Sequence, residues 1–298
     1  MLLNSLDKFI EIAASKPKKK IAVAAAEDKP VLEAVYAALK AGIVEPILVG
    51  DKERINAIAK DIGFDLDDIK IIDEKNPAEA CKICVKEVKE KRAHILMKGL
   101  VGSADFLRAI LNKETGLRKG SLLSHTGFFE ADHYHKVIAV TDAAQNISPT
   151  VEDKVGIINN AVDMFHRLGV DKPKVGIVAA VEVVNTKMQA TVDAALLTMM
   201  NKRGQIKGCV IDGPLAFDNI VSKEATEHKG IISDVAGDAD LIVVPNIEVG
   251  NVLYKSFTYF AGASVAAVML GASAPIVLTS RADSDRSKLL SIALAASY

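Results

Sequence analysis

The sequence predicts an α/β fold in which mostly parallel strands alternate with helices. Short runs of β-branched residues recur along the 298-residue chain, and most are continuously apolar, which is typical of strands covered on both faces. Longer segments with helical periodicity separate these runs. Strand and helix alternating in this way favours right-handed crossovers between parallel strands.

The predicted elements follow one another in a regular order. The strands occupy residues 20–25, 46–49, 94–97, 136–140, 174–179, 208–211, 240–244 and 275–279. The helices between them include residues 30–41, 103–112, 151–168 and 186–203. Thr150 is expected to cap the third of these helices, with Asp153 three residues on, and Gly169 to end it. The longest apolar run, residues 262–274, is interpreted as a buried helix followed by a turn.

Composition excludes several classes of function. The chain is 50% hydrophobic and 25% charged, which is typical of a folded globular protein, and its net charge is −1. A nucleic-acid partner is not expected, because such binders usually carry a basic excess. No apolar run approaches the roughly 18–20 residues that span a bilayer. The first fifteen residues carry no basic leader, so we expect a cytoplasmic location and no membrane partner.

Cysteine usage agrees with that location. Cys81, Cys84 and Cys209 are an odd, small set, which argues against a disulfide framework. The first two form a C-x-x-C, the pattern of a redox pair or of half a zinc site. No second pair completes a zinc site, and residues 78–92 have the pattern of one amphipathic helix. We therefore interpret both as ordinary helix cysteines.

Ligands in α/β folds bind at the carboxyl ends of the strands. Loops that are small, polar and rich in glycine or asparagine follow predicted strands at residues 98–105, 141–146, 212–218, 245–251 and 279–285. These loops are the first candidates for a functional site.

The last of these loops holds the tightest group of reactive side chains. Arg281 offers a planar fork of donors for a phosphate or an oxyanion, and Ser280 adds a hydroxyl. Asp283 and Asp285 offer acceptors for a proton. Helix capping by Ser284 or Asp283 explains part of the pattern, but a cap does not require arginine at the end of a buried strand.

Residues 98–103 form a glycine-bearing loop between a strand and a helix. A helix N-terminus attracts phosphate, so Lys98, Gly102 and Ser103 are candidate substrate-binding residues. The loop is not a Walker motif, and no G-x-G-x-x-G follows a strand, which disfavours a classical dinucleotide site.

The loop after residue 244 is unusually polar for a segment beside a buried strand. Asn246, Gly250, Asn251, Tyr254 and Lys255 are candidate substrate-binding residues, and the last three fall within one helical turn. The alternative is that Asn251 caps a helix and Tyr254 belongs to the core.

Three histidines suggest a metal site but do not have the pattern of one. His125, His133 and His135 are predicted to lie in a loop with Glu130 and Asp132, without H-E-x-x-H spacing. We expect a solvated loop and no metal site. The absence of a G-x-S-x-G turn disfavours a Ser–His–Asp hydrolase.

Two motifs carry a family resemblance. The chain resembles the phosphate acetyltransferase and phosphate butyryltransferase family in Pro245-Asn246-x-x-x-Gly250-Asn251-x-x-Tyr254-Lys255 and in Thr279-Ser280-Arg281-Ala282-Asp283-Ser284. Ser103-Ala104-Asp105 with Arg108, and GPLAFD at residues 213–218, fit the same family. The segments KGLVGSADFLRAIL and GPLAFDNIVS look more like the butyryltransferases.

The resemblance implies a fold and a reaction. The fold is a two-domain one like that of isocitrate and isopropylmalate dehydrogenases, with the active cleft between the domains. Residues 1–130 and 272–298 would form the first domain and residues 131–271 the second. The reaction is reversible transfer of a butanoyl group between coenzyme A, which is a substrate and not a tightly bound cofactor, and inorganic phosphate. A homo-oligomer is also implied, and residues 259–270 fit either its interface or the core.

The resemblance also suggests roles for residues. In the acetyltransferases the serine and arginine matching Ser280 and Arg281 serve the site, and an aspartate further along acts as base. The matching position here is Ser287, which leaves Asp283 and Asp285 as substitutes. We expect direct transfer, in which a carboxylate takes the thiol proton of coenzyme A and the arginine stabilises the oxyanion and the phosphate.

Alternatives stay open at this point. A phosphate acetyltransferase differs in pocket size, for which Leu100 and Phe217 are the suggested walls. A metal- and NAD-dependent dehydrogenase of the same fold would need several aspartates around one ion. A non-catalytic CoA-binding protein would not need Ser280 and Arg281. A covalent acyl-cysteine route is disfavoured because Cys209 begins a predicted strand, at the wrong end for the cleft.

Overall fold

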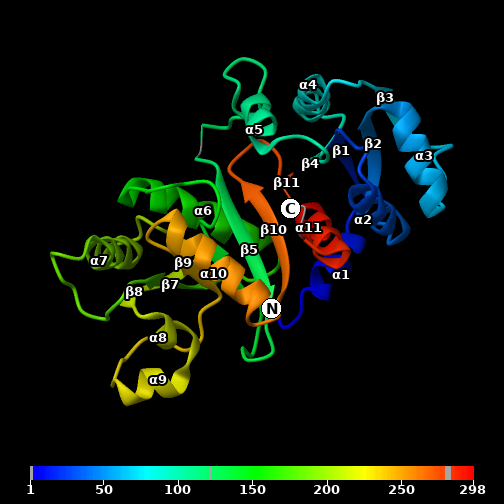
Figure 1. The fold of residues 1–298 in the computed structure, drawn as a ribbon. Coiled ribbons are helices and arrows are strands. Elements are labelled where there is room, and N and C mark those ends of the chain that lie inside the picture. The colour runs from blue at the N-terminus through cyan, green and yellow to red at the C-terminus, as the bar shows by residue number, and fades with distance from the viewer. Residues whose placement is uncertain (1–2, 121, 279–282) are drawn as a thin grey trace. The chain divides into compact units, whose positions relative to one another are not determined.

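A computed structural model describes residues 3–120, 122–278 and 283–298. The chain falls into two compact units (Figure 1). Unit 1 comprises Met1–Leu6 and Leu122–Val265, and unit 2 comprises Asp7–Ser121 and Ala266–Tyr298. The domain boundaries expected from the sequence stay a prediction, as do the likeness to isocitrate and isopropylmalate dehydrogenases and the cleft.

The sheet of unit 2 is parallel except at one strand. Its strands lie in the order β3-β2-β1-β4-β11-β10, and β10 runs antiparallel to β11. They span Lys70–Asp73 (β3), Val44–Gly50 (β2), Lys19–Ala24 (β1), Ile95–Lys98 (β4), Ile276–Val277 (β11) and Ser264–Leu270 (β10). Most of their side chains are buried, which accounts for the continuously apolar runs in the sequence.

The helices of unit 2 pack on this sheet and on each other. They are α1 (Asp7–Ala14), α2 (Lys29–Lys40), α3 (Lys52–Ile62), α4 (Pro77–Lys89), α5 (Ser103–Leu111) and α11 (Asp285–Ser297). The α4 helix packs on β1, β2 and β4, while α2 and α11 lie side by side (Figure 1). The Asp51 and Asn76 side chains cap α3 and α4 by accepting hydrogen bonds from main-chain N–H groups of the first turn.

The sheet of unit 1 has one antiparallel pair and is otherwise parallel. Its strand order is β5-β6-β9-β7-β8, with β5 antiparallel to β6. The strands span Ser124–Glu130 (β5), Ile138–Thr141 (β6), Leu241–Val243 (β9), Lys174–Val178 (β7) and Val210–Leu215 (β8). The registers place the carboxyl ends of β6, β9, β7 and β8 at the same edge.

The helices of unit 1 have ends that the sequence largely predicts. They are α6 (Val151–Arg167), α7 (Gln189–Lys202), α8 (Phe217–Val221), α9 (Lys223–His228) and α10 (Ile247–Tyr259). Thr150 and Asp153 form the expected capping box of α6, and Gly169 follows that helix with a φ of 82°. α6 packs on β5, β6 and β9, and α10 packs on β6.

Each predicted strand overlaps an observed strand, but one predicted helix is wrong. Residues 264–270 of the supposed buried helix form β10, a strand of which all but the first residue are buried. A strand buried on both faces has no alternation, so its sequence cannot be distinguished from a buried helix by periodicity. The strands β3, β5 and β10 were not predicted.

The predicted solvated histidine loop is also partly wrong. His125 and Glu130 lie on β5, where the His125 side chain is buried. Glu130 is half-buried and accepts hydrogen bonds from Ser5 Oγ and the Leu6 main-chain N–H. His133 and His135 are exposed, in agreement with the prediction. No helix in the described part of the chain is long and apolar enough to span a bilayer.

Candidate active site

The loop between β4 and α5 holds a buried lysine against its own backbone. Lys98, the last residue of β4, is buried, and its Nζ donates to the carbonyl oxygens of Gly99 at 3.2 Å and of Val101 at 3.1 Å. Gly99 is required here, because a Cβ would lie 2.2 Å from the Ala25 carbonyl oxygen. The tight turn therefore fixes an ammonium group at the carboxyl edge of unit 2.

The start of α5 is open to an anion. Gly102 occupies the N-cap position with no side-chain cap, and Ser103, an exposed residue, begins the helix. Uncapped N–H groups of a helix N-terminus attract negative charge. Asp105, in the first turn of α5, forms an ion pair with Arg108. The predicted residues Lys98, Gly102 and Ser103 thus lie along one short segment.

The β11 strand ends at the same edge of unit 2, because its Val277 lies opposite Met97 of β4 in a parallel register. Ser280 and Arg281, the catalytic residues predicted on the resemblance, lie outside the described residues. Asp283 is half-buried, and its carbonyl oxygen accepts a hydrogen bond from Lys288 Nζ. Asp285 is the exposed first residue of α11. Carboxyl groups thus flank the start of a helix that follows the β11 strand.

Of the two residues suggested from the sequence as helix caps in this segment, Ser284 and Asp283, only Ser284 is one. Ser284 is the N-cap of α11, and its Oγ accepts from the Ser287 main-chain N–H at 3.1 Å. Ser287, which stands where the family resemblance expects a base, is buried and accepts at its Oγ from Ser284 Oγ at 3.0 Å. A buried hydroxyl engaged in a cap is unsuited to act as a general base.

In unit 1, the predicted polar loop after β9 becomes the first turns of α10. Asn246, not Asn251, is the N-cap, and its side chain accepts from the Val249 main-chain N–H at 3.1 Å. The Asn251 Nδ2 group donates to the Ala143 carbonyl oxygen at 3.4 Å. Gly250 allows this close approach, because a Cβ there would lie 2.3 Å from the Asp142 carbonyl oxygen. The helix is therefore held against the loop that follows β6.

Tyr254 and Lys255 occupy adjoining faces of α10, as predicted. The half-buried Tyr254 ring packs against His125 at 5.7 Å and edge-on against Phe129 at 5.1 Å between ring centroids. Lys255 is exposed. The ring of Tyr254 therefore has the core contact foreseen in the alternative interpretation, while its neighbour Lys255 faces solvent.

Asp142 organises the loop after β6, which the sequence marked without selecting a residue. This buried carboxylate accepts from four N–H donors, namely the main chain of His125, Ala144 and Gln145 and the side chain of Asn146. The Asn146 contact is the shortest, at 2.6 Å. The network fixes the loop on which α10 packs, so Asp142 supports the site without facing solvent.

Sequence reasoning missed the loop after β7, residues 179–188, and its partner Lys229. The Lys229 Nζ group lies 2.6 Å from Glu182 and 3.3 Å from Asp218, and it donates to Asn219 Oδ1 at 3.0 Å. The predicted strand 174–179 was a usable signal, since the edge rule applies equally to the loop that follows it, which holds three valines, a glutamate and one asparagine. The partner could not be found, because it is 47 residues away.

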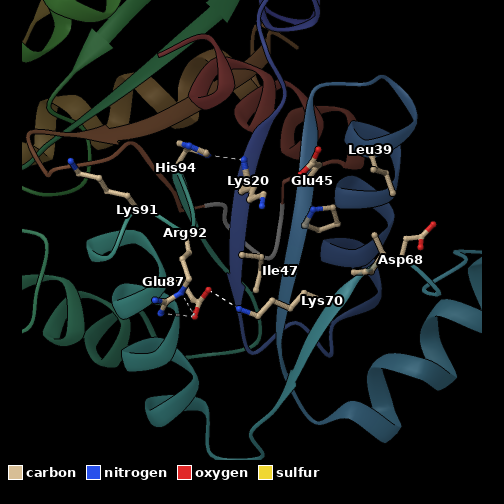
Figure 2. A pocket seen from close by; sticks show the side chains of 12 residues that line it. Lys20, Leu39, Glu45, Ile47, Asp68, Lys70, Glu87, Lys91, Arg92 and His94 are labelled. Atoms are coloured by element: carbon tan, nitrogen blue, oxygen red, sulfur yellow. Dashed lines mark hydrogen bonds and ion pairs between the residues drawn. The ribbon is translucent and has the colours of Figure 1, made fainter.

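A cavity of about 660 Å³ lies elsewhere, at the amino edge of the unit 2 sheet (Figure 2). Lys20, Lys70 and His94 line it, and none of the predicted site residues does. Glu87 in its wall accepts from Arg92 and Lys70, each at 2.9 Å, and the hydrogen bond from Arg92 is the main reason why the pKa of Glu87 lies below its usual range. The cavity is not part of the candidate site.

The cysteines are poor nucleophiles where they stand. Cys81, Cys84 and Cys209 are all buried, the first two on α4. Burial raises the pKa of Cys209 to about 11 and is also the main reason why that of Cys81 rises to about 11. Since the thiolate is the reactive form, this environment disfavours a covalent acyl-cysteine. In the described ranges, no three His, Cys, Asp or Glu side chains are grouped as metal ligands would be.

The fold and these loops define a class, an α/β protein with candidate anion-binding groups at the carboxyl edges of its sheets. Residues 5–94 and 78–296 match the family model described as phosphate acetyl/butaryl transferase, and the chain belongs to this family.

Relatives cover almost the whole chain. A phosphate butyryltransferase of Clostridium beijerinckii is 52% identical over 98% of this chain and 97% of its own length. A phosphate acetyltransferase of Thermotoga maritima is 43% identical over 98% and 99%. The crystal structure of a branched-chain phosphotransacylase from Enterococcus faecalis is similar, with a TM-score of 0.81 and 32% identity over 93% of this chain and 97% of that one. The family resemblance stated from the sequence is thus confirmed.

Proposed function

We propose that this chain is a phosphate butyryltransferase, which interconverts butanoyl-CoA plus phosphate and butanoyl phosphate plus CoA. The observation that carries the proposal is the 52% identity, over nearly the full length, to a protein of that name. The chain is accordingly an acyltransferase whose substrates are acyl-CoA and inorganic phosphate. Coenzyme A enters as a substrate, and no tightly bound cofactor is proposed.

The proposed chemistry is direct transfer without a covalent enzyme intermediate. In the direction that consumes the acyl phosphate, a carboxylate takes the proton of the CoA thiol. The sulfur then attacks the acyl carbonyl carbon, and the bond from that carbon to the phosphate oxygen breaks as phosphate leaves. Asp285 is our first choice of base because its carboxylate is exposed at the start of α11, with Asp283 as the alternative.

Arg281 and Ser280 are proposed to stabilise the oxyanion and the leaving phosphate. The guanidinium offers two parallel donors to phosphate, and each oxyanion donor is typically worth a factor on the order of 10²–10³ in rate. Lys98 and the uncapped start of α5, with Gly102 and Ser103, are proposed to hold the phosphate dianion in the reverse direction.

The α10 segment is proposed to contact acyl-CoA. Asn246 and Gly250 fix the start of the helix against the loop after β6, whereas Asn251, Tyr254 and Lys255 present an amide, a phenol ring and an ammonium group. Asn246 and Gly250 thus position the helix, and Asn251, Tyr254 and Lys255 bind acyl-CoA. A fold like that of isocitrate dehydrogenases, the implied cleft and a cytoplasmic location belong to the same proposal.

A homo-oligomer is part of the proposal as well. Large apolar side chains are exposed on α10 and at its C-cap, with Val252 63%, Tyr259 71% and Phe260 94% exposed. Exposed apolar side chains of this size favour association with a partner. We propose a second copy of this chain as that partner. Light scattering coupled to size-exclusion chromatography measures the molar mass in solution and so shows whether the chain self-associates.

One assay separates the candidate functions. Thiol release from butanoyl-CoA and acetyl-CoA is followed with and without phosphate, and reduction of NAD is followed as a control. Phosphate-dependent release that is faster with butanoyl-CoA supports the proposal. Faster release with acetyl-CoA favours a phosphate acetyltransferase, the alternative supported by the 43% identity to the enzyme of that name from Thermotoga maritima. NAD reduction without thiol release would point to a dehydrogenase.

A further inference from the structure

The loop after β7 and the start of α8 leave the sheet of unit 1 side by side. The Val178 residue pairs with Leu215 in the parallel register, and the Ala179 main-chain N–H donates to the Leu215 carbonyl oxygen at 2.8 Å. We call residues 179–188 the β7–α7 loop. The first residue of this loop therefore lies beside Leu215 of the GPLAFD motif. Both lie at the carboxyl edge, where α/β folds bind ligands.

Lys229 then fastens the two segments to each other. A single ammonium nitrogen is shared by Glu182 of the β7–α7 loop, at 2.6 Å, and by Asp218 of α8, at 3.3 Å. It also donates to Oδ1 of the fully buried Asn219 at 3.0 Å, so the lysine is also hydrogen-bonded to a buried side chain of α8. The Lys229 side chain therefore bridges the β7–α7 loop and α8.

Exposed apolar side chains are the sequence neighbours of the two carboxylates in this ion pair. Val183 and Val184 follow Glu182 and are 68% and 56% exposed, while Phe217 precedes Asp218 and is 36% exposed. The Phe217 ring is backed by Phe257 of α10, with 5.9 Å between the centroids. These side chains would gain free energy from an apolar ligand that covers them.

The charge around these apolar side chains decides which part of the substrate can cover them. Two carboxylates, Glu182 and Asp218, share one ammonium group at this place, which disfavours phosphate and the anionic end of coenzyme A. The acyl chain is the uncharged, apolar part of the substrates. It carries no donor or acceptor beyond its carbonyl, and an aliphatic and aromatic wall is suited to it.

We propose that Val183, Val184 and Phe217 form the wall that contacts the acyl chain, and that Lys229 is a positioning residue that holds this wall in place. The inference rests on the proposed acyl transfer and assigns the determinant of chain length within it. Phe217 was a suggested pocket wall from the sequence, and the valines and the lysine are new.

The test is a chain-length profile measured as kcat/KM for acetyl-, butanoyl- and hexanoyl-CoA at saturating phosphate. Phe217→Ala removes bulk and should raise the hexanoyl-to-butanoyl ratio roughly tenfold, whereas Val184→Phe adds bulk and should shift preference toward acetyl-CoA by a similar factor. Met199→Ala is the matched control, because Met199 is an apolar residue on α7 outside the wall, and its exposure of 50% falls within the range of the wall residues.

The positioning role has its own signature. Lys229→Met should raise the KM for butanoyl-CoA and weaken the chain-length preference, leave the KM for phosphate unchanged and leave the circular dichroism spectrum intact. Lys229→Arg should restore the preference, since arginine can also bridge two carboxylates.

The outcomes separate the inference from the proposed function. If the unaltered chain transfers butanoyl groups but both wall variants keep its chain-length ratios within about twofold, the inference is overturned and the function stands. If the unaltered chain releases no thiol with any acyl-CoA, the proposed function falls and the inference falls with it.

Discussion

Val277 of β11 lies opposite Met97 of β4 in a parallel register, one residue before Lys98. The segments that follow these two strands therefore leave the sheet of unit 2 at the same edge. One segment carries Lys98 and the start of α5, and the other leads through residues 279–282 to Asp283 and Asp285. Groups suited to phosphate and groups suited to proton transfer are 185 residues apart from Lys98 to Asp283, yet the segments that carry them follow neighbouring strands.

The first prediction concerns Lys98. Lys98→Met keeps the length of the side chain but removes the buried positive charge, so the KM for phosphate should rise by about tenfold or more. Initial rates at varied phosphate and fixed butanoyl-CoA measure this. Lys113→Met, at an exposed position beyond α5, is the control and should behave as the unaltered chain. An unchanged KM for phosphate in the Lys98 variant would remove this residue from the phosphate site.

The second prediction concerns Arg281. Arg281→Ala should lower kcat by a factor on the order of 10²–10³ while thermal unfolding is unchanged, because it removes donors from the developing oxyanion. Stopped-time thiol release gives the rate, and circular dichroism reports the fold. Near-normal turnover in this variant would contradict the role proposed for the guanidinium.

The third prediction identifies the base. Asp285→Asn should lower kcat in the direction of CoA acylation by roughly 10²–10⁴, whereas Asp283→Asn should keep kcat near that of the unaltered chain. Both substitutions keep size and polarity, so a purely structural effect would not separate them. The reverse ranking of the two variants would reassign the base to Asp283.

The fourth prediction concerns Cys209. Because burial raises the pKa of this thiol to about 11, very little thiolate exists at neutral pH, and Cys209→Ala should keep turnover within about twofold. Some loss of stability, about 1 kcal/mol, is expected from the small cavity. A well-folded variant without activity would revive the covalent route.

The fifth prediction concerns acid stability at the amino edge of unit 1. Burial by itself would raise the pKa of Asp238, but hydrogen bonds from Lys174, His135 and Lys136 outweigh it and hold the pKa well below the usual range. A depressed carboxyl pKa contributes stability that is present above the unfolded pKa, about 3.9, and is lost as pH falls below it.

Urea unfolding at pH 7, 5 and 3.5 checks this sign. The stability difference between the unaltered chain and Asp238→Asn should shrink as the pH falls through about 4. Asp171→Asn is the control, since Asp171 is exposed and, among the described residues, has no hydrogen bond or ion pair. A difference that is constant over this range would show that Asp238 does not stabilise the fold through its charge.

The fold was predictable wherever the sequence had a distinctive period or an end signal. The capping pair of Thr150 and Asp153 marked the first residue of α6 correctly, because a cap depends on neighbours in the chain. The strand β10 was mistaken for a helix because SVAAVML is apolar on both faces, and β5 was missed because SHTGFFE mixes polar and aromatic residues. Burial of both strands is decided by partners that no local pattern contains.

The candidate site was predictable as loops but not as contacts. The edge rule selected Lys98, Asn246 and the segment around Asp285, because the ends of parallel strands meet at one edge. It did not select the Lys229 ion pairs or the four-donor shell of Asp142, which arise from residues brought together by folding. Asn251 was the suggested cap in the alternative interpretation, but the observed N-cap lies five residues earlier, at Asn246.

The measurement that tests the central claim most directly is phosphorus NMR of the purified chain with butanoyl-CoA and inorganic phosphate. The account predicts a phosphate-dependent acyl phosphate resonance that grows together with free thiol in equal amounts, and faster with butanoyl-CoA than with acetyl-CoA. Thiol release without an acyl phosphate, or no reaction with either thioester, would contradict it.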